Sequence, residues 1–137
     1  MQQIFLSCFF LFVSGFLYAA EMSLDISEEI DISSDNIEIK ETKIEFINNV
    51  VFKSSSYEIF GEIAEFDKDM DLIQIKGSPI KFKIVSKDSS FNGFSNIIII
   101  KENEISFSGN AILETDSSII NGEFIKLNKN SGELQIK

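Results

Sequence analysis

Apolar and polar residues alternate along most of this chain. The alternation begins at Ile30-Asp31-Ile32 and recurs at positions 37–39, 44–46, 72–76, 80–84, 105–107 and 134–136. A period of two is typical of β-strands that bury one face. Turn-forming residues separate these segments at positions 33–36, 48–49, 53–56, 67–71, 77–79, 87–90, 101–103, 115–118 and 128–132. The pattern predicts an all-β domain, either a sandwich, a roll or a barrel.

An internal repeat accompanies the alternation. Residues 44–76 align with residues 105–137 at a constant shift of 61 positions and without a gap. About a third of the 33 aligned positions are identical, and most of the others exchange similar residues, as Phe52 does with Leu113. Such self-similarity indicates stacked hairpins that share one continuous core. Glycines recur with it, Gly61 and Gly77 being 16 positions apart like Gly93 and Gly109, and they predict bulges or tight bends.

The repeat also indicates which side chains share a face, because each face is seen in two copies. The apolar positions of that face are the candidate lipid-binding residues: Ile44, Phe46, Val50, Phe52, Ile59, Phe66, Ile73, Ile75, Ile105, Phe107, Leu113, Ile120 and Leu127. Stacked hairpins would align them as one long apolar stripe. The stripe is either a hydrophobic core, which composition alone favours, or an elongated groove for a lipid.

Composition narrows the possible chemistry. The net charge is −10, all basic residues are Lys, and the chain has no His, Arg or Trp. The charge argues against nucleic acid as a partner, because nucleic-acid binding needs a basic surface. Without His, the usual catalytic triads and zinc sites cannot form. An active site built from carboxylates alone stays open as an alternative, but no motif supports it. We therefore expect no catalytic residues, no metal site and no cofactor.

One acidic turn leaves an alternative open. Asp67, Asp69 and Asp71 alternate as they do in some calcium loops. An EF-type loop requires Gly at its sixth position and Glu at its twelfth, where this chain has Leu72 and Ser78. A solvated hairpin turn is therefore the favoured interpretation.

The first 20 residues carry no charged side chain and are apolar from Ile4 to Ala20. They match a secretory signal peptide with a small-residue end at Ala19-Ala20, although the region before the apolar run lacks Lys and Arg. The alternative is an uncleaved membrane anchor, for which this run is short. Cleavage would remove Cys8, the only cysteine, and leave residues 21–137 as a single exported domain.

Three segments form an ordered series of short motifs. Residues 30–39 (Ile-Asp-Ile-Ser-Ser-Asp-Asn-Ile-Glu-Ile) contain a short strand, a Ser-Asp pair and an alternating strand. Residues 107–113 (Phe-Ser-Gly-Asn-Ala-Ile-Leu) form an apolar-Gly-Asn step, where the first copy has Asn48 in place of Gly, and residues 119–128 form a closing phrase around Gly122. In these motifs and their order the chain resembles the OstA-like family of lipopolysaccharide transport proteins, and the resemblance covers residues 30–137.

A member of this family, if LptA-like, is expected to be a periplasmic protein that forms an open, twisted antiparallel β-jellyroll. The resemblance implies that it binds lipid A acyl chains of lipopolysaccharide in an apolar interior and performs no catalysis. Its expected partners are inner-membrane LptC-like and outer-membrane LptD-like proteins. Two alternatives remain open: a membrane-anchored LptC-like component that keeps residues 1–20, and a structural envelope β-protein with no lipid ligand.

The ends of the repeat predict how copies assemble. Strand 72–76 of the first copy is followed by another strand at 80–84, whereas its counterpart 133–137 has no successor. An unpaired strand edge tends to pair with another chain. The expected assembly edges are Leu134 and Ile136 at one end and Ile30, Ile32, Ile37 and Ile39 at the other. Pairing between unlike edges would be head to tail and would not close.

Overall fold

The computed structural model describes residues 30–86 and 89–137. The expected signal peptide at residues 1–20 lies outside these described residues. No helix is present in the described ranges, so none there could cross a membrane. The described residues form nine strands: β1 (Asp31–Ser33), β2 (Asn36–Ile39), β3 (Lys43–Lys53), β4 (Tyr57–Asp67), β5 (Leu72–Ser86), β6 (Ser89–Ile100), β7 (Glu104–Glu114), β8 (Ile119–Asn128) and β9 (Leu134–Ile136).

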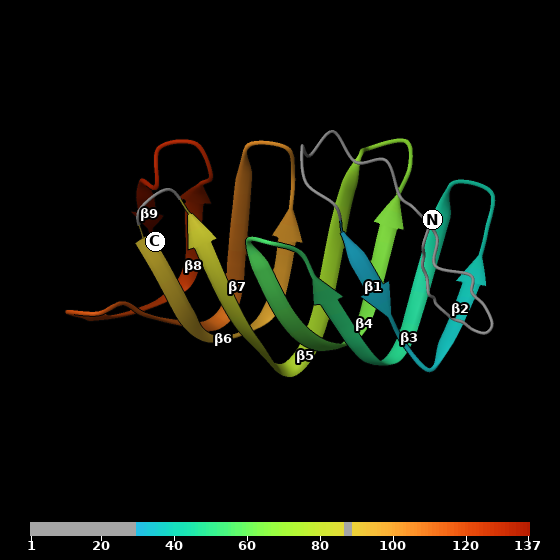
Figure 1. Cartoon of the computed structure of the whole chain (residues 1–137), viewed down its shortest axis with the longest axis horizontal. Coiled ribbons are helices and arrows are strands. Elements are labelled where there is room, and N and C mark those ends of the chain that lie inside the picture. The colour runs from blue at the N-terminus through green and yellow to red at the C-terminus, as the bar shows by residue number, and fades with distance from the viewer. Residues whose placement is uncertain (1–29, 87–88) are drawn as a thin grey trace.

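All nine strands belong to one antiparallel sheet. Its order is β1-β3-β4-β5-β6-β7-β8-β9, and β2 pairs with β3 next to β1. From β3 onwards each strand therefore pairs with the next strand of the chain, as in a series of hairpins (Figure 1). The arrangement confirms the predicted all-β fold.

A line of irregular positions crosses the sheet. On β3 it falls at Asn48 and Asn49, and on β7 at Gly109 and Asn110, and all four residues have positive φ, between 52° and 77°. The register also shifts in the middle of β4, β5 and β6. Bulges bend the strands that contain them. Their alignment forms a crease along which the sheet folds into two layers (Figure 1).

Contacts between strands that are not neighbours show that the two layers face each other. The ring of Phe82 on β5 stacks on that of Phe107 on β7, with centroids 4.8 Å apart, although β6 lies between these strands in the sheet. Lys129, which follows β8, places its Nζ 5.7 Å from the ring centre of Tyr57 at the start of β4. The molecule is thus an open β-jellyroll.

The turns after β4 and β8 are the same structure displaced by 61 residues. In each turn the side-chain oxygen of the first residue, Asp67 or Asn128, accepts hydrogen bonds from the backbone N–H groups two and three positions later. The residues with positive φ, Asp71 and Gly132, also correspond. The side chain of Asp67 therefore stabilises a hairpin turn, in agreement with the favoured interpretation of this acidic segment. Among the described residues, no group of three or more acidic, His or Cys side chains could hold a metal ion.

Two segments predicted as turns are bulges. Positions 48–49 and 77–79 lie inside β3 and β5, at the crease. The same residues suit turns and bulges, because both need unusual backbone conformations such as positive φ. The strands are consequently longer than the alternation predicted, reaching 15 residues in β5.

Gly93 on β6 is a position that only glycine fits. A Cβ atom there would lie 1.8 Å from the carbonyl oxygen of Ile112 on β7. Gly93→Ala should force the two strands apart and lower the free energy of unfolding by about 3 kcal/mol. In Gly122→Ala the nearest atom to the added Cβ would be the Cγ2 methyl of Ile136 at 3.1 Å, and no backbone atom would be closer than 3.4 Å, so this control should cost much less. The free energies of unfolding are measured by urea denaturation, and equal losses in the two variants would contradict a specific requirement for glycine at position 93.

Candidate functional site

The space between the two layers is lined by apolar side chains along the whole sheet. Strands β3 to β8 all contribute buried residues to a single cluster. Ser95 is the only polar side chain buried among the described residues, and its Oγ donates to the carbonyl oxygen of Ile97 at 3.2 Å. This interior therefore offers no charged group to a ligand and suits only apolar chains.

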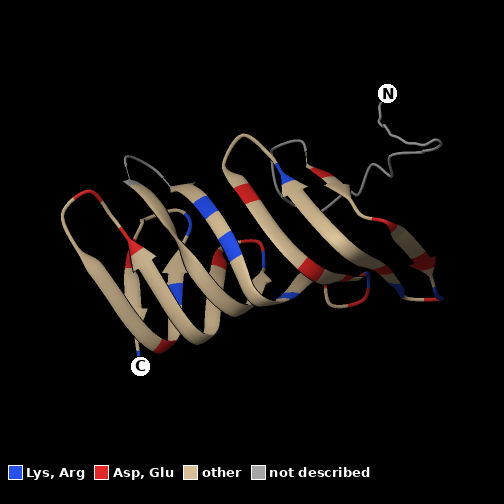
Figure 2. Ribbon diagram, turned by 90° about the horizontal axis from the view of Figure 1, so that it is seen from below, with Lys and Arg blue, Asp and Glu red and all other residues tan. Residues whose placement is uncertain are grey.

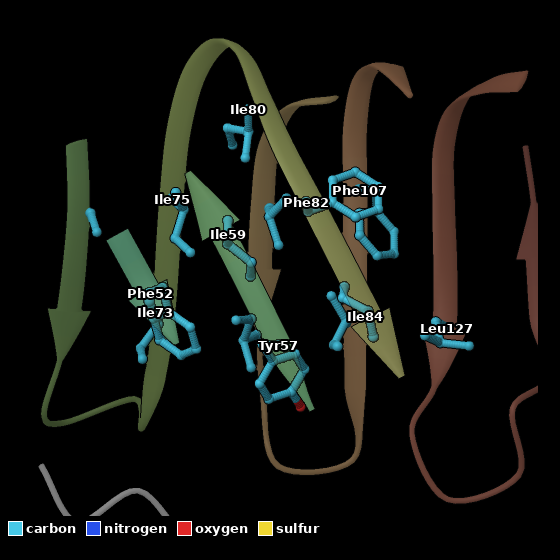
Figure 3. Close-up of a cluster of buried hydrophobic side chains, with 14 of the residues drawn as sticks. Phe52, Tyr57, Ile59, Ile73, Ile75, Ile80, Phe82, Ile84, Phe107 and Leu127 are labelled. Atoms are coloured by element: carbon cyan, nitrogen blue, oxygen red, sulfur yellow. The ribbon is translucent and has the colours of Figure 1, made fainter. Parts of the chain in front are cut away.

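The structure places the thirteen candidate lipid-binding residues on this interior face. Eleven of them are buried, with no more than 6% of any residue exposed. Ile44 and Ile120 are half-buried and pack against the cluster. Figure 3 shows members of the cluster from different strands, including Phe52, Phe107 and Leu127, between the ribbons. The repeat thus identified the inward face, whereas lipid binding by these residues remains a prediction.

The sequence argument missed the central part of the interior. Residues 77–104 lie between the two copies of the repeat, so a comparison of copies does not cover them. Positions 80–84 alternate and carried a usable signal, but the run of four isoleucines from Ile97 to Ile100 has no alternation that would identify its inner face. The interior residues missed in this part are Ile80, Phe82, Ile84, Phe91, Ile98 and Ile100, and Tyr57 on β4 was missed as well.

At both ends of the sheet the interior face continues onto exposed residues. Ile37 on β2 lies opposite Phe46, so both side chains are on the inner face, yet Ile37 is 50% exposed. Ile136 on β9 lies opposite the buried Ile125 and is 51% exposed. Ile39 on β2 is 68% exposed. In the described chain the apolar face therefore reaches the surface at both ends of the sheet.

Within residues 30–86 and 89–137, the N-terminal edge presents backbone groups without a partner beside these side chains. The N–H of Lys40 donates to the carbonyl oxygen of Lys43 at 2.8 Å. Hydrogen-bonded and non-hydrogen-bonded pairs alternate in an antiparallel ladder. The N–H and C=O groups of Ile37 and Ile39 therefore point away from β3. The other predicted edge residues here, Ile30 and Ile32, pack half-buried against the core.

The C-terminal edge has the same construction. The N–H of Lys137 donates to the carbonyl oxygen of Phe124 at 2.9 Å, so the alternation directs the backbone groups of Leu134 and Ile136 away from β8. Leu134 itself packs half-buried against the core. In the described chain, β9 pairs only with residues 125–127 of β8. The first half of β8 adds a further unpaired stretch to this edge.

An antiparallel sheet folded along a crease, with an apolar interior and unpaired edges at both ends of the described chain, is an open β-jellyroll. The crystal structure of LptH, the LptA-homologous periplasmic component of the conserved lipopolysaccharide transport device from Pseudomonas aeruginosa, has the same fold. The TM-score is 0.73, and the match covers 83% of this chain and 85% of LptH at 14% sequence identity. No protein-family model and no curated protein sequence matches. The likeness confirms the predicted fold.

Proposed function

We propose that this protein is a periplasmic carrier that binds lipopolysaccharide through its lipid A acyl chains, held between the two layers of the jellyroll. The observation that supports this function most directly is the interior itself. It is apolar along the whole sheet and continues onto exposed isoleucines at both ends, in the fold of a lipopolysaccharide transport component. The sugar and phosphate groups of the ligand remain in solvent, because the interior has no charged partner for them.

Acyl chains enter this interior by displacing side-chain contacts. Phe52 and Phe107 have no exposed surface, so the two layers must separate on the side away from the crease. The exchange replaces contacts among apolar side chains with contacts between side chains and acyl chains. Both arrangements keep apolar surface out of water, so the net free-energy cost of the exchange is small.

Photo-crosslinking at matched inner and outer positions tests the lipid path. A photoreactive residue at Phe107 should capture lipopolysaccharide in cells, because this position is fully buried in the interior. The same residue at Glu45, which forms an ion pair with Lys40 at 3.2 Å on the outer face, should capture little. The measurement is the amount of crosslinked lipopolysaccharide at each position. Equal capture would show that the assigned face is wrong.

We also propose that the two edges join protomers, or a protomer and its membrane partners, head to tail. Pairing the edge at Ile136 with the edge at Ile37 would continue the backbone ladder from one molecule to the next. It would also join the two exposed ends of the interior face. LptC-like proteins in the inner membrane and LptD-like proteins in the outer membrane are the expected neighbours at the ends of such a bridge.

The N-terminal segment distinguishes the carrier from a membrane-anchored LptC-like component. We propose that residues 1–20 are a signal peptide and are removed on export. The mass of the exported protein decides between the two roles: a chain that starts near Glu21 is a free carrier, and a chain that keeps residues 1–20 is anchored.

A further inference from the structure

Basic residues are concentrated on one strand of this acidic protein. Strand β5 carries Lys76, Lys81 and Lys83 and no acidic residue, and the neighbouring β6 carries no charge at all. Figure 2 shows blue bands close together in the middle of the sheet. In the described chain none of these three ammonium groups takes part in an ion pair, whereas four other lysines pair with glutamates: Lys40, Lys43, Lys53 and Lys126.

Large apolar side chains are exposed beside these lysines. Lys81 lies opposite Phe60 on β4 and opposite Phe94 on β6, so the three side chains form a row across the sheet. The row is on the outer face, because the neighbours of Lys81 on β5, Ile80 and Phe82, are buried inside. Phe60 is 40% exposed and Phe94 is 42% exposed.

The same face continues along β5. Lys83 and Val85 follow Lys81 at alternate positions, and Val85 is 45% exposed. We call the five residues Phe60, Lys81, Lys83, Val85 and Phe94 the outer patch. Carboxylates border this patch. Glu58 on β4 lies directly opposite Lys83 and forms its ion pair with Lys53, at 3.7 Å. Glu114 on β7 lies in the same row beyond Asn92, and Glu62 accepts a hydrogen bond from the backbone N–H of Ser78 at 3.1 Å.

We propose that the outer patch binds the surface of a membrane that contains anionic lipids. Exposed phenylalanines insert at the boundary between headgroups and acyl chains, and lysines meet the lipid phosphates while their methylene stems lie along the apolar layer. A chain of net charge −10 is repelled by such a surface in most orientations. The outer patch therefore also sets the orientation of a protomer that lies at the membrane outside a head-to-tail bridge, with β4 to β6 against the lipid.

A local probe in the full chain tests this proposal. A photoreactive benzoyl-phenylalanine replaces Phe94 in one variant and Met70 in another, because Met70 is 68% exposed but lies in the turn after β4. Each variant is irradiated with vesicles of phosphatidylglycerol or of phosphatidylcholine. Position 94 should capture phosphatidylglycerol several-fold more than position 70 does, and more than it captures phosphatidylcholine. Salt should reduce the capture. An apolar N-terminus would tether both variants equally, so the comparison reports on the patch.

Charge substitutions complete the test. Replacing both Lys81 and Lys83 with glutamine should reduce capture at position 94 roughly 25-fold, because each lysine near an anionic surface contributes about fivefold to binding. The control replaces Lys43 and Lys126 with glutamine, which changes the net charge equally at lysines paired with glutamates, and should retain capture. Equal capture at positions 94 and 70, equal capture of the two lipids, or no effect of the Lys81 and Lys83 substitutions would overturn the proposal. Capture of a polypeptide in place of lipid in whole envelopes would also overturn it.

Discussion

Phe107→Asp is expected to prevent the domain from folding. The Phe107 side chain is completely buried and stacks on Phe82, with ring centroids 4.8 Å apart. Burying an unpaired carboxylate in this interior costs several kcal/mol in addition to the lost packing, and a domain is typically stable by only about 5–15 kcal/mol. Circular dichroism and urea denaturation should therefore show an unfolded or strongly destabilised chain.

Two further variants make this expectation specific to the interior. Phe107→Ala should retain the fold while lowering the free energy of unfolding by about 3–5 kcal/mol. Phe94→Ala removes the same side chain from the outer face, where it is 42% exposed, and should cost about 1 kcal/mol or less. Similar costs at the two positions would mean that the inner and outer faces are assigned incorrectly.

A conservative change then separates folding from ligand binding. Phe107→Leu keeps an apolar side chain and should leave a folded protein with only part of the packing lost. Added lipopolysaccharide should raise the melting temperature of the intact protein and raise that of this variant less. A structural β-protein with a closed core would show no rise in either case, which would exclude the carrier function and leave the fold unaffected.

The fold and the interior face were predictable because the chain contains its own comparison. Phe46 and Phe107 occupy equivalent positions in the two copies, so the two copies indicate the same inner face independently. Both residues are buried. The crease was not predictable in the same way. Asn48-Asn49 carries chemistry that suits a turn or a bulge equally well, and only pairing with β4 on both sides of the pair decides between them.

The outer patch illustrates a second limit. Phe60 and Phe94 are far apart in the sequence and resemble other strand aromatics. They flank Lys81 only because β4 and β6 both pair with β5 in one register. Their exposure likewise depends on the direction in which the sheet folds, since the face on the inside of the crease becomes the core. Neither the register nor this direction follows from a period of two.

Blocking either sheet edge with proline is expected to weaken head-to-tail assembly at least tenfold. Ile136→Pro removes an N–H group that points away from β8, and Ile37→Pro removes one that points away from β3. Both substitutions leave the ladder of the protomer itself in place. Proline at Gln135 would not test the edge alone, because the same alternation directs the N–H group of Gln135 toward β8, inside the protomer. Loss of one intermolecular hydrogen bond, with its acceptor left unpaired, should weaken association at least tenfold.

Mixing the two variants tests the direction of pairing. Each variant keeps one working edge, so sedimentation velocity should show a monomer for each alone and a one-to-one dimer for the mixture, while the intact protein forms longer assemblies. Ile136→Thr keeps the backbone donor and shortens the exposed side chain, so it should assemble more strongly than Ile136→Pro. If like edges paired, one of the two proline variants would dimerise alone. An intact protein that stays monomeric at high concentration, and binds neither membrane partner, would rule out a bridge built from these edges.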